Sequence, residues 1–456
     1  MRLSFAEVRP KPAAPAPAPV APPASSAQPL EVATVDTAYL ALKNEMHGRL
    51  IERLTLSGIE KTPREQVRAD VSAVVRDLMQ EDGRPVSAAD MRRLVDDLLD
   101  ELLGYGPLEP LLRDPDVSDI LVNTCAEVYA ERKGVIELTA VRFADEAHLV
   151  RVIQRIVDKI GRRVDESQPL VDARLPDGSR VNAVVPPIAV DGSLLSIRKF
   201  AKIPFDLDRL VANGSMTQAC ADLLKGVVAC RKNILISGGT GTGKTTMLNA
   251  MSRGIGERER IVTIEDAAEL QLQQRHVARL ETRPSNVEGK GQITQRDLVK
   301  NALRMRPDRI IVGEVRGGEA FDMLQAMNTG HDGSMTTVHA NTPRDALSRL
   351  EQMIGMAGID LPTRSMRAQI ASAIDVVVQL KRFSDGTRRV ISVQEIDGME
   401  GDMITMQEVF RFEQTGTAPD GRVQGRFVAT GVRPKFFADF EAYGVRVPQD
   451  LTRLCA

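Results

Sequence analysis

The sequence predicts an α/β protein whose carboxyl-terminal part is a parallel sheet flanked by helices. From residue 204 onward, helix-like and strand-like segments alternate along the chain. Several strand candidates are short, continuous apolar runs, which is typical of strands buried on both faces of a parallel sheet. A glycine-rich segment at 238–245 follows one of these runs and precedes a helical pattern. A turn of this kind between a strand and a helix is where α/β proteins bind phosphate groups.

The 456 residues are enough for two to four domains, and changes of pattern suggest where they divide. Residues from about Pro10 to Pro29 alternate Pro and Ala, which predicts a disordered head over residues 1–35. Residues 36–104 carry three helical patterns and predict a three-helix bundle, and residues 105–201 predict a mixed α/β domain. A linker is expected at 202–208. The alternating domain then spans 209–456 and ends in a β-rich appendage.

The strand candidates are runs of apolar and β-branched residues bounded by turn residues. In the mixed domain they lie at 120–123, 128–131, 135–138, 180–185 and 194–200, with one helix at 146–161. In the alternating domain they lie at 233–237, 260–264, 277–280, 309–312 and 334–338. The appendage is expected to contain three more strands, at 376–381, 388–396 and 404–412.

The composition is that of a soluble globular protein, with 43% hydrophobic and 27% charged residues. The 60 Lys and Arg residues nearly balance 62 Asp and Glu residues, and only 4% of residues are aromatic, none of them Trp. This argues against a nucleic-acid-binding protein, which needs a basic field or stacking side chains. The widely spaced cysteines, Cys125, Cys220, Cys230 and Cys455, indicate reduced thiols in a cytosolic protein. No apolar run reaches the roughly 18 residues of a membrane span, so membrane association is expected to need a protein partner.

The glycine-rich segment fits the pattern G-x-x-x-x-G-K-[ST] and predicts a P-loop NTPase (RecA-like) core. Its glycines let consecutive backbone N–H groups line a concavity at the start of a helix. The Lys244 ammonium is expected to reach the β- and γ-phosphates of ATP, and the Thr245 hydroxyl to bind Mg²⁺. The predicted nucleotide-binding residues are Gly238, Gly239, Thr240, Gly241, Thr242, Gly243, Lys244, Thr245 and Thr246.

Two later strands end in acidic residues that can manage the metal and the attacking water. Glu314 ends the apolar run 309–312 after one glycine, about 70 residues beyond Lys244, and Glu265 ends the run 260–264. Parallel strands end at the same edge of a sheet, so both acids are expected beside the phosphate loop. A solvated acidic turn is the common alternative for one such residue, but two of them in a P-loop domain favour a catalytic pair.

Two histidines, His331 and His339, flank the strand candidate at 334–338. A metal site is poorly supported because no further Cys or His lies at ligand spacing. A structural role is the usual one for a single histidine. The two histidines, however, come after the strand candidate 309–312 that leads to Glu314. This position suggests that they sense the γ-phosphate, with an imidazole donating a hydrogen bond to it.

Together these segments resemble the Walker A, Asp box, Walker B and His box of the secretion ATPase superfamily, which drives type II and type IV secretion and type IV pili. The matching segments are 238–245, 264–266, 313–316 and 336–341. The segments 104–112 and 174–183 are similar to the CpaF branch, which serves Tad (Flp) pili. The resemblance extends from residue 36 to the C-terminus. One departure from a generic NTPase is that the Walker B strand ends in Gly-Glu rather than Asp-Glu.

The resemblance implies a homo-hexamer that hydrolyses ATP with Mg²⁺ and powers pilus assembly at the bacterial inner membrane, with retraction by the same motor left open. ATP then lies between the core and the preceding domain, whose Arg174, Arg180 and Arg198 match the family's phosphate-binding arginines. Glu314 is favoured for positioning Mg²⁺ through water and Glu265 for orienting water, although the two can exchange roles. The protein is expected to be cytoplasmic and to meet the membrane through platform proteins. Regulatory partners are expected at the bundle.

Other functions stay open at this point. One is an ATPase of a related type II or type IV secretion system, and another is a regulatory scaffold that binds ATP with little turnover. A DNA-handling ATPase is disfavoured by the charge balance. A GTPase is disfavoured because no Asn-Lys-x-Asp segment is present.

Overall fold

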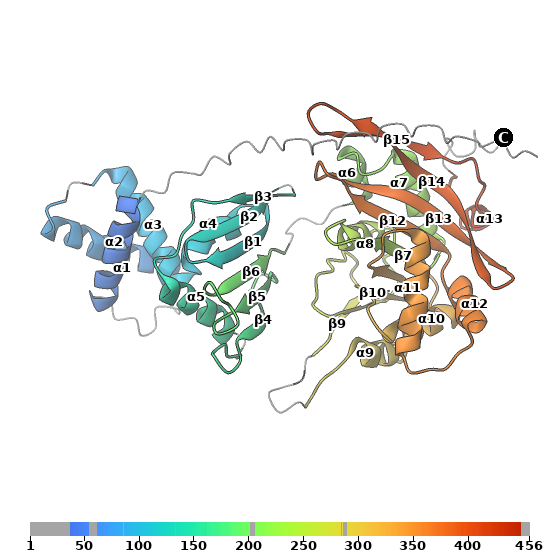
Figure 1. Ribbon diagram of the computed structural model, residues 1–456, viewed down its shortest axis with the longest axis horizontal. Helices are drawn as coiled ribbons and strands as arrows, with labels where there is room; N and C mark the ends of the chain where they lie inside the picture. Colours follow the sequence, from blue (N-terminus) through green and yellow to red (C-terminus); the bar gives the residue numbers. More distant parts are fainter. Residues whose placement is uncertain are drawn as a thin grey trace, which may run out of the picture.

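The computed structural model describes residues 37–53, 62–84, 86–132, 134–159, 161–200, 206–283, 285 and 290–447. The predicted head, most of the predicted linker and Cys455 lie outside these residues. A helical bundle, a mixed α/β domain and a larger α/β domain follow one another along the chain (Figure 1). The predicted α/β fold class with a RecA-like core is confirmed.

The bundle consists of α1 (Thr37–Arg53), α2 (Arg64–Glu81) and α3 (Ala88–Leu103). Its helices bury one apolar face each, as amphipathic helices do. Met46, Leu50, Val71, Leu78 and Leu98 are fully buried between them. Helix α3 begins at the N-cap Ser87, whose hydroxyl accepts the N–H of Asp90 at 3.1 Å.

A buried ionic cluster joins the bundle to the next domain. Glu101 on α3 accepts from Lys43 Nζ at 2.7 Å and lies 2.9 Å from His148 Nε2. Burial by itself would raise the pKa of Glu101, but the hydrogen bond of His148 and the charge of Lys43 outweigh it and lower the pKa to about 2. The left-handed Gly106 lies against this carboxylate, since a Cβ there would be 2.5 Å from Oε2. Both the φ of Gly106 and its contact with Glu101 therefore favour glycine at this position.

The mixed domain begins with a 3₁₀ turn (Gly106–Leu108) and the short helix α4 (Glu109–Arg113). Its strands are β1 (Val117–Thr124), β2 (Glu127–Arg132), β3 (Val135–Leu138), β4 (Leu170–Arg174), β5 (Arg180–Val184) and β6 (Leu194–Arg198). They form one antiparallel sheet in the order β3-β2-β1-β6-β5-β4. Helix α5 (Glu146–Asp158) covers one face of it. Strand β4 was not predicted, because its sequence places an exposed Leu170 and a charged Asp172 on an edge strand.

The larger domain is built on a sheet of nine strands in the order β15-β14-β13-β12-β7-β11-β10-β8-β9. The six strands from β12 to β9 are parallel, and β11 lies between β7 and β10 as in RecA-like cores. The parallel strands are β7 (Ile234–Gly238), β8 (Ile261–Glu265), β9 (Val277–Glu281), β10 (Arg309–Val312), β11 (Met335–Val338) and β12 (Val376–Arg382). The antiparallel strands are β13 (Arg388–Glu400), β14 (Met403–Thr417) and β15 (Val423–Ala429).

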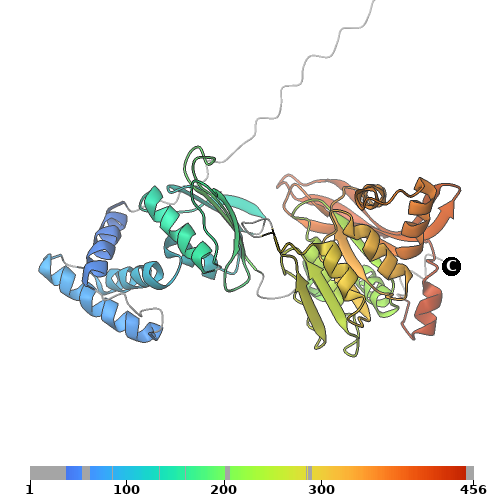
Figure 2. The same cartoon turned by 90° about the horizontal axis from the view of Figure 1, so that it is seen from below.

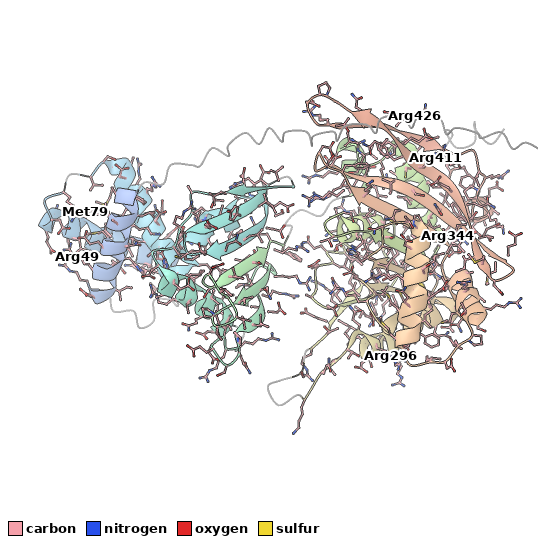
Figure 3. The ribbon with its side chains drawn as sticks, viewed as in Figure 1. Arg49, Met79, Arg296, Arg344, Arg411 and Arg426 are labelled. Atoms are coloured by element: carbon pink, nitrogen blue, oxygen red, sulfur yellow. The ribbon has the colours of Figure 1, made fainter. Side chains whose placement is uncertain are left out.

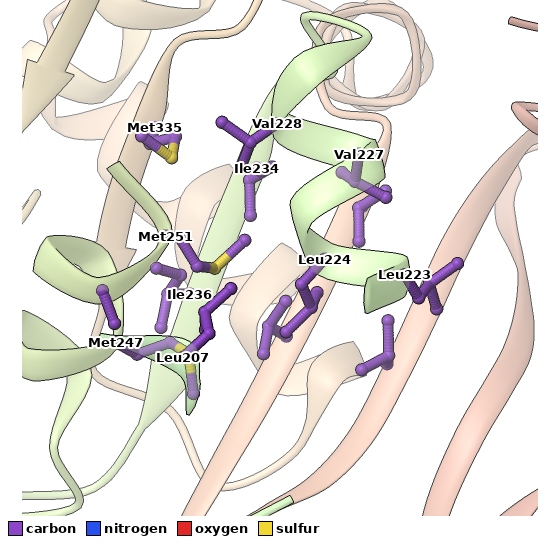
Figure 4. Close-up of a cluster of buried hydrophobic side chains, with 14 of the residues drawn as sticks. Leu207, Leu223, Leu224, Val227, Val228, Ile234, Ile236, Met247, Met251 and Met335 are labelled. Carbon is purple, nitrogen blue, oxygen red and sulfur yellow. The ribbon is translucent and has the colours of Figure 1, made fainter. Parts of the chain in front are cut away.

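Helices cover both faces of this sheet (Figure 2). Because successive strand residues point to opposite faces, Ile234 and Ile236 of β7 pack into one core and Leu235 into the other. Figure 4 shows the first core, where Val227, Met251 and Met335 gather around β7. The helices of the first face are α6 (Leu207–Ala212), α7 (Gln218–Ala229), α8 (Lys244–Ser252) and α13 (Phe437–Ala442). Those of the second are α9 (Gln295–Ala302), α10 (Glu319–Asn328), α11 (Pro343–Met356) and α12 (Thr363–Ala373).

The carboxyl-terminal strands continue the main sheet. Strand β12 pairs in parallel with β7, and β13 to β15 then extend the same sheet by antiparallel pairing. Strand β15 was not predicted, because Gly425 and its charged neighbours interrupt the alternation. The position needs glycine, since any Cβ there would overlap the ring of Phe412.

We expect Glu101→Ala to destabilise the amino-terminal part by about 3–5 kcal/mol, because it leaves Lys43 buried without its partner. Since the pKa of Glu101 lies below its unfolded value of 4.5, the stability it contributes is present above that pH and is lost as the pH falls toward 2. Urea unfolding followed by circular dichroism at pH 7 measures the change. The control is Glu81→Ala, which removes an exposed pair with Arg53. Equal stability of the two variants would contradict the prediction.

Candidate active site

The glycine-rich segment forms a phosphate loop between β7 and α8. Gly241 and Gly243 have φ of 68° and 93°, in the left-handed region that residues with a side chain rarely adopt. Helix α8 begins directly after Gly243, so its free N–H groups open toward the loop. The loop therefore has the backbone shape that a phosphate group requires.

Lys244 is held by the loop itself. Its Nζ donates to the carbonyls of Gly238 and Gly239 at 3.0 Å each and lies 3.8 Å from Glu314 Oε1. Burial lowers the pKa of Lys244, and the carboxylate of Glu314 acts against this shift. An arriving phosphate can take the place of the weakly placed carboxylate, because it brings more charge to a partly desolvated ammonium.

Glu265, at the end of β8, is almost completely buried, with 3% of its surface exposed. Its Oε2 accepts the N–H groups of Glu269 and Leu270 at 2.7 and 2.8 Å, while its buried Oε1 has no partner. Burial raises the pKa of Glu265, against the effect of those two hydrogen bonds. One oxygen thus anchors the side chain and the other is free to accept from a water molecule.

The Gly-Glu ending of the Walker B strand has a steric explanation. A Cβ on Gly313 would lie 3.0 Å from Cγ of Glu265, so a larger residue there would press on the Glu265 side chain. Parallel pairing brings the ends of β8 and β10 together, with Val312 opposite Ile264. The two acidic residues predicted from separate strands are therefore neighbours in the fold.

Glu314 points its other oxygen at Arg316, whose Nε and Nη2 donate to Oε2 at 2.9 and 2.5 Å. Arg316 also lies 3.9 Å from Asp266. Arg316 lies in the segment 313–316 that resembles Walker B, and the sequence by itself indicates no role for it. In the structure it fixes the orientation of Glu314.

The donors beside the loop fit Mg²⁺. The Thr245 hydroxyl and the Glu314 carboxylate are hard oxygen ligands, which this ion prefers. Among the residues that the structure describes, no three His, Cys, Asp or Glu side chains form a complete metal site. Water and nucleotide phosphates would thus supply the remaining ligands. Bound there, the ion would neutralise charge on the β- and γ-phosphates.

The two predicted histidines lie at opposite ends of the strand β11 (Met335–Val338). His339 follows β11 and is half-buried near Lys244 and Glu314, where burial and then the charge of Lys244 lower its pKa. This shift favours the neutral imidazole, which can donate one N–H. His331 precedes β11 and contacts the carbonyl of Ala326 through Nδ1 at 3.2 Å. Strand β11 is parallel to β7, so its carboxyl end lies beside the phosphate loop and its amino end lies away from it. His331, at the amino end, is therefore not near the loop.

The three predicted arginines form a row across the exposed face of the mixed domain. Arg174 of β4 is directly opposite Arg180 of β5, and Arg180 is directly opposite Arg198 of β6. Like charges in opposite positions repel, so such a row is stable only with anions nearby. Asp119 of β1 continues the row and accepts from Arg198 at 3.2 Å.

This row faces the P-loop domain. Arg174 donates to Glu281 at 2.9 Å and Arg180 to Glu269 at 2.7 Å. Arg198 is near enough to Lys244 to contribute to the lowering of its pKa. The sequence grouped these arginines only through family resemblance, whereas the sheet register places them side by side.

Two further arginines beside the loop were not predicted. Arg388 donates through Nε to the carbonyl of Gly241 at 2.8 Å, and Arg382 lies directly opposite Arg388 across the β12–β13 hairpin. The only signal in the sequence is their position on either side of the Asp-Gly turn at 385–386, which predicts a hairpin and no ligand.

Known proteins can be compared with this arrangement. A family model described as type II/IV secretion system protein matches residues 101–427. The chain belongs to this family. Its membership agrees with the nucleotide loop and acidic pair described above, and it confirms the prediction of an ATPase. No described helix is both long and apolar enough to cross a membrane.

Several relatives of this secretion family resemble the chain over most of their length. A putative conjugal transfer protein of Mycobacterium tuberculosis is 42% identical over 307 residues, which cover 66% of this chain and 87% of that protein. The type IV secretion system protein PtlH of Bordetella pertussis is 37% identical and covers 64% and 94%. Among solved structures, the VirB11 ATPase of the Brucella suis type IV secretion system is 30% identical, with a TM-score of 0.35, over 63% of this chain and 92% of that one.

We expect Glu265→Gln to abolish turnover without destabilising the fold. The pKa of Glu265 is raised above its unfolded value of 4.5. The wild-type protein therefore loses stability as the pH rises from 4.5 through the pKa of the folded state. The neutral glutamine should remove this loss and leave the variant equal in stability at pH 7 or up to about 1 kcal/mol more stable. Thermal unfolding between pH 4.5 and 8, together with phosphate release, measures both effects. A less stable variant with full turnover would contradict the assignment.

Proposed function

We propose that this chain is the ATP-hydrolysing motor of a Tad (Flp) type IV pilus and works as a homo-hexamer at the cytoplasmic side of the bacterial inner membrane. The arginine row of the mixed domain, which faces the phosphate loop and its acidic residues, is the main support. A nucleotide in the loop would meet groups from both domains. The segments 104–112 and 174–183 favour the Tad branch through their resemblance to it.

In this proposal, each residue has one part in ATP hydrolysis. Lys244 and the loop N–H groups hold the β- and γ-phosphates, while Thr245 and Glu314 are the protein's oxygen donors for Mg²⁺. Glu265 accepts a hydrogen bond from water through its free oxygen and orients it toward the γ-phosphorus. As the new P–O bond forms, the bond from the γ-phosphorus to the β–γ bridging oxygen breaks. The arginines and the His339 N–H compensate the charge on the transferred group.

Movement would follow from an exchange of partners. In the structure, Arg174 and Arg180 pair with Glu281 and Glu269 across the domain boundary. Phosphate oxygens are stronger acceptors for guanidinium groups than partly exposed carboxylates. ATP binding and release would therefore shift these arginines between two sets of partners and change the angle between the domains. Platform proteins in the membrane would receive this motion, with regulatory partners at the bundle.

A second candidate is an energising ATPase of a type IV secretion or conjugation system. The names of the M. tuberculosis and B. pertussis relatives favour it. Deletion of the gene from its own bacterium separates the two. Loss of surface pili supports the pilus motor, and loss of protein or DNA transfer with normal piliation supports the second candidate.

We expect Glu314→Gln to bind ATP with nearly wild-type affinity and to lose at least about 100-fold in turnover, because it removes a charge that acts on the metal and water. Lys244→Ala should lose both binding and turnover. Calorimetric titration with ATPγS and a phosphate-release assay measure these effects. If the wild-type protein with Mg²⁺ hydrolyses ATP no faster than Lys244→Ala, the motor proposal fails and the regulatory scaffold replaces it.

We expect Arg180→Ala to lower turnover by about 100-fold or more while leaving the melting temperature within 2 °C of wild type. The reason is that Arg180 is partly exposed and makes a surface ion pair, which contributes little to stability. The matched control is Arg151→Ala on α5, also an exposed arginine of this domain. A fall in melting temperature with unchanged specific activity would contradict the phosphate-binding role.

A further inference from the structure

The strands on the two sides of β7 divide the region around the phosphate loop. Glu265 ends β8, and Glu314 and His339 follow β10 and β11; these three strands all lie on one side of β7. On the other side lies β12, with the β12–β13 hairpin at its end. The acidic residues and the γ-phosphate belong together, since hydrolysis takes place there. The other end of the nucleotide, with its α-phosphate and ribose, is then directed toward the hairpin.

Arg382 and Arg388 occupy this end. They form a directly opposed pair across the hairpin, a placement that costs energy unless an anion shares the two charges. Both touch the loop: Arg388 donates to the Gly241 carbonyl, and a Cβ on Gly241 would lie 3.3 Å from Nη1 of Arg382. Their neighbours Lys381 and Arg389 lie over the Phe383 ring instead. Successive side chains of a strand point to opposite faces of the sheet. Of these four basic residues, only Arg382 and Arg388 therefore point toward the phosphate loop.

In the structure, the carboxylate beside this arginine pair comes from the other domain. Glu131 of β2 lies 3.5 Å from Arg388 Nη2 and 3.9 Å from Arg382 Nη2. Arg382 also donates to the Gly134 carbonyl in the β2–β3 turn. Glu131 belongs to the same register row as Asp119 and Arg198. One carboxylate at these distances is a weak partner for two guanidinium groups and can be replaced by a doubly charged phosphate chain.

We propose that Arg382 and Arg388 form a second phosphate-binding site of the nucleotide, which contacts the base-proximal α- and β-phosphates, and that Glu131 occupies it when no nucleotide is bound. This inference rests on the proposed ATPase function and adds residues to that site. It also gives the two domains a contact that depends on the nucleotide and is separate from the arginine row. ADP and ATP share these two phosphates, so both ligands engage the site equally.

The test is calorimetric titration of the full chain with Mg·ADP and with Mg·ATPγS. Arg388→Ala and Arg382→Ala should each weaken both ligands by a similar factor of about ten, because each loses charged hydrogen bonds to phosphate. Arg388→Lys should recover part of the loss. The control is Arg426→Ala, which removes the same charge from the exposed strand β15 (Figure 3) and should change neither affinity. Glu131→Gln should bind ADP about two- to fivefold more tightly, since the competing carboxylate is gone.

The outcomes are distinct. Unchanged ADP affinity in both arginine variants overturns the site, as does an equal loss in Arg426→Ala, which would indicate an effect of net charge alone. A loss for ATPγS without a loss for ADP places the arginines at the γ-phosphate and overturns the base-proximal assignment. Unchanged affinity in Glu131→Gln overturns the competition. If the wild-type chain binds neither ligand, the proposed ATPase function itself fails.

Discussion

Parallel pairing of β7 with β11 on one side and β12 on the other is the constraint on which the rest of the structure depends. It brings the carboxyl ends of β8, β10 and β11 to the edge where the phosphate loop opens. It also fixes the β12–β13 hairpin at the opposite side of the loop. Backbone hydrogen bonds buried under helices on both faces hold this pairing, so the site has little freedom to deform.

Two side chains beside the phosphate loop, Lys244 and Glu265, lie in surroundings that reduce the stability of the fold. Lys244 and Glu265 are charged groups in a partly desolvated place, and an oxygen of Glu265 has no partner. Desolvated charges and unpaired polar atoms destabilise a fold, and hydrogen bonds to phosphate or water would offset that cost. Gly313 belongs to the same arrangement, because a Cβ there would lie only 3.0 Å from Cγ of Glu265.

The face of the mixed domain complements this edge in charge. Its row of arginines meets Glu269 and Glu281, and its acidic residue Glu131 meets Arg382 and Arg388. Both sets of ion pairs are partly exposed, so each contributes little to stability and can exchange partners at low cost. By contrast, the buried pair of Lys43 with Glu101 ties the bundle to the mixed domain. The two boundaries thus differ in the kind of contact they use.

Much of the site could be predicted from the sequence, because a phosphate loop and a buried parallel strand are set by local steric needs and by apolar runs. Residues 238–245, Glu265, Glu314 and His339 all lie at the edge that the strand order predicts. His331 does not, and the direction of β11 was the missing consideration. Edge strands β4 and β15 were missed because exposed positions weaken the periodic pattern. Only the tertiary structure placed Arg388 at Gly241, aligned the three arginines and explained Gly313, since these depend on long-range register, which no local pattern encodes.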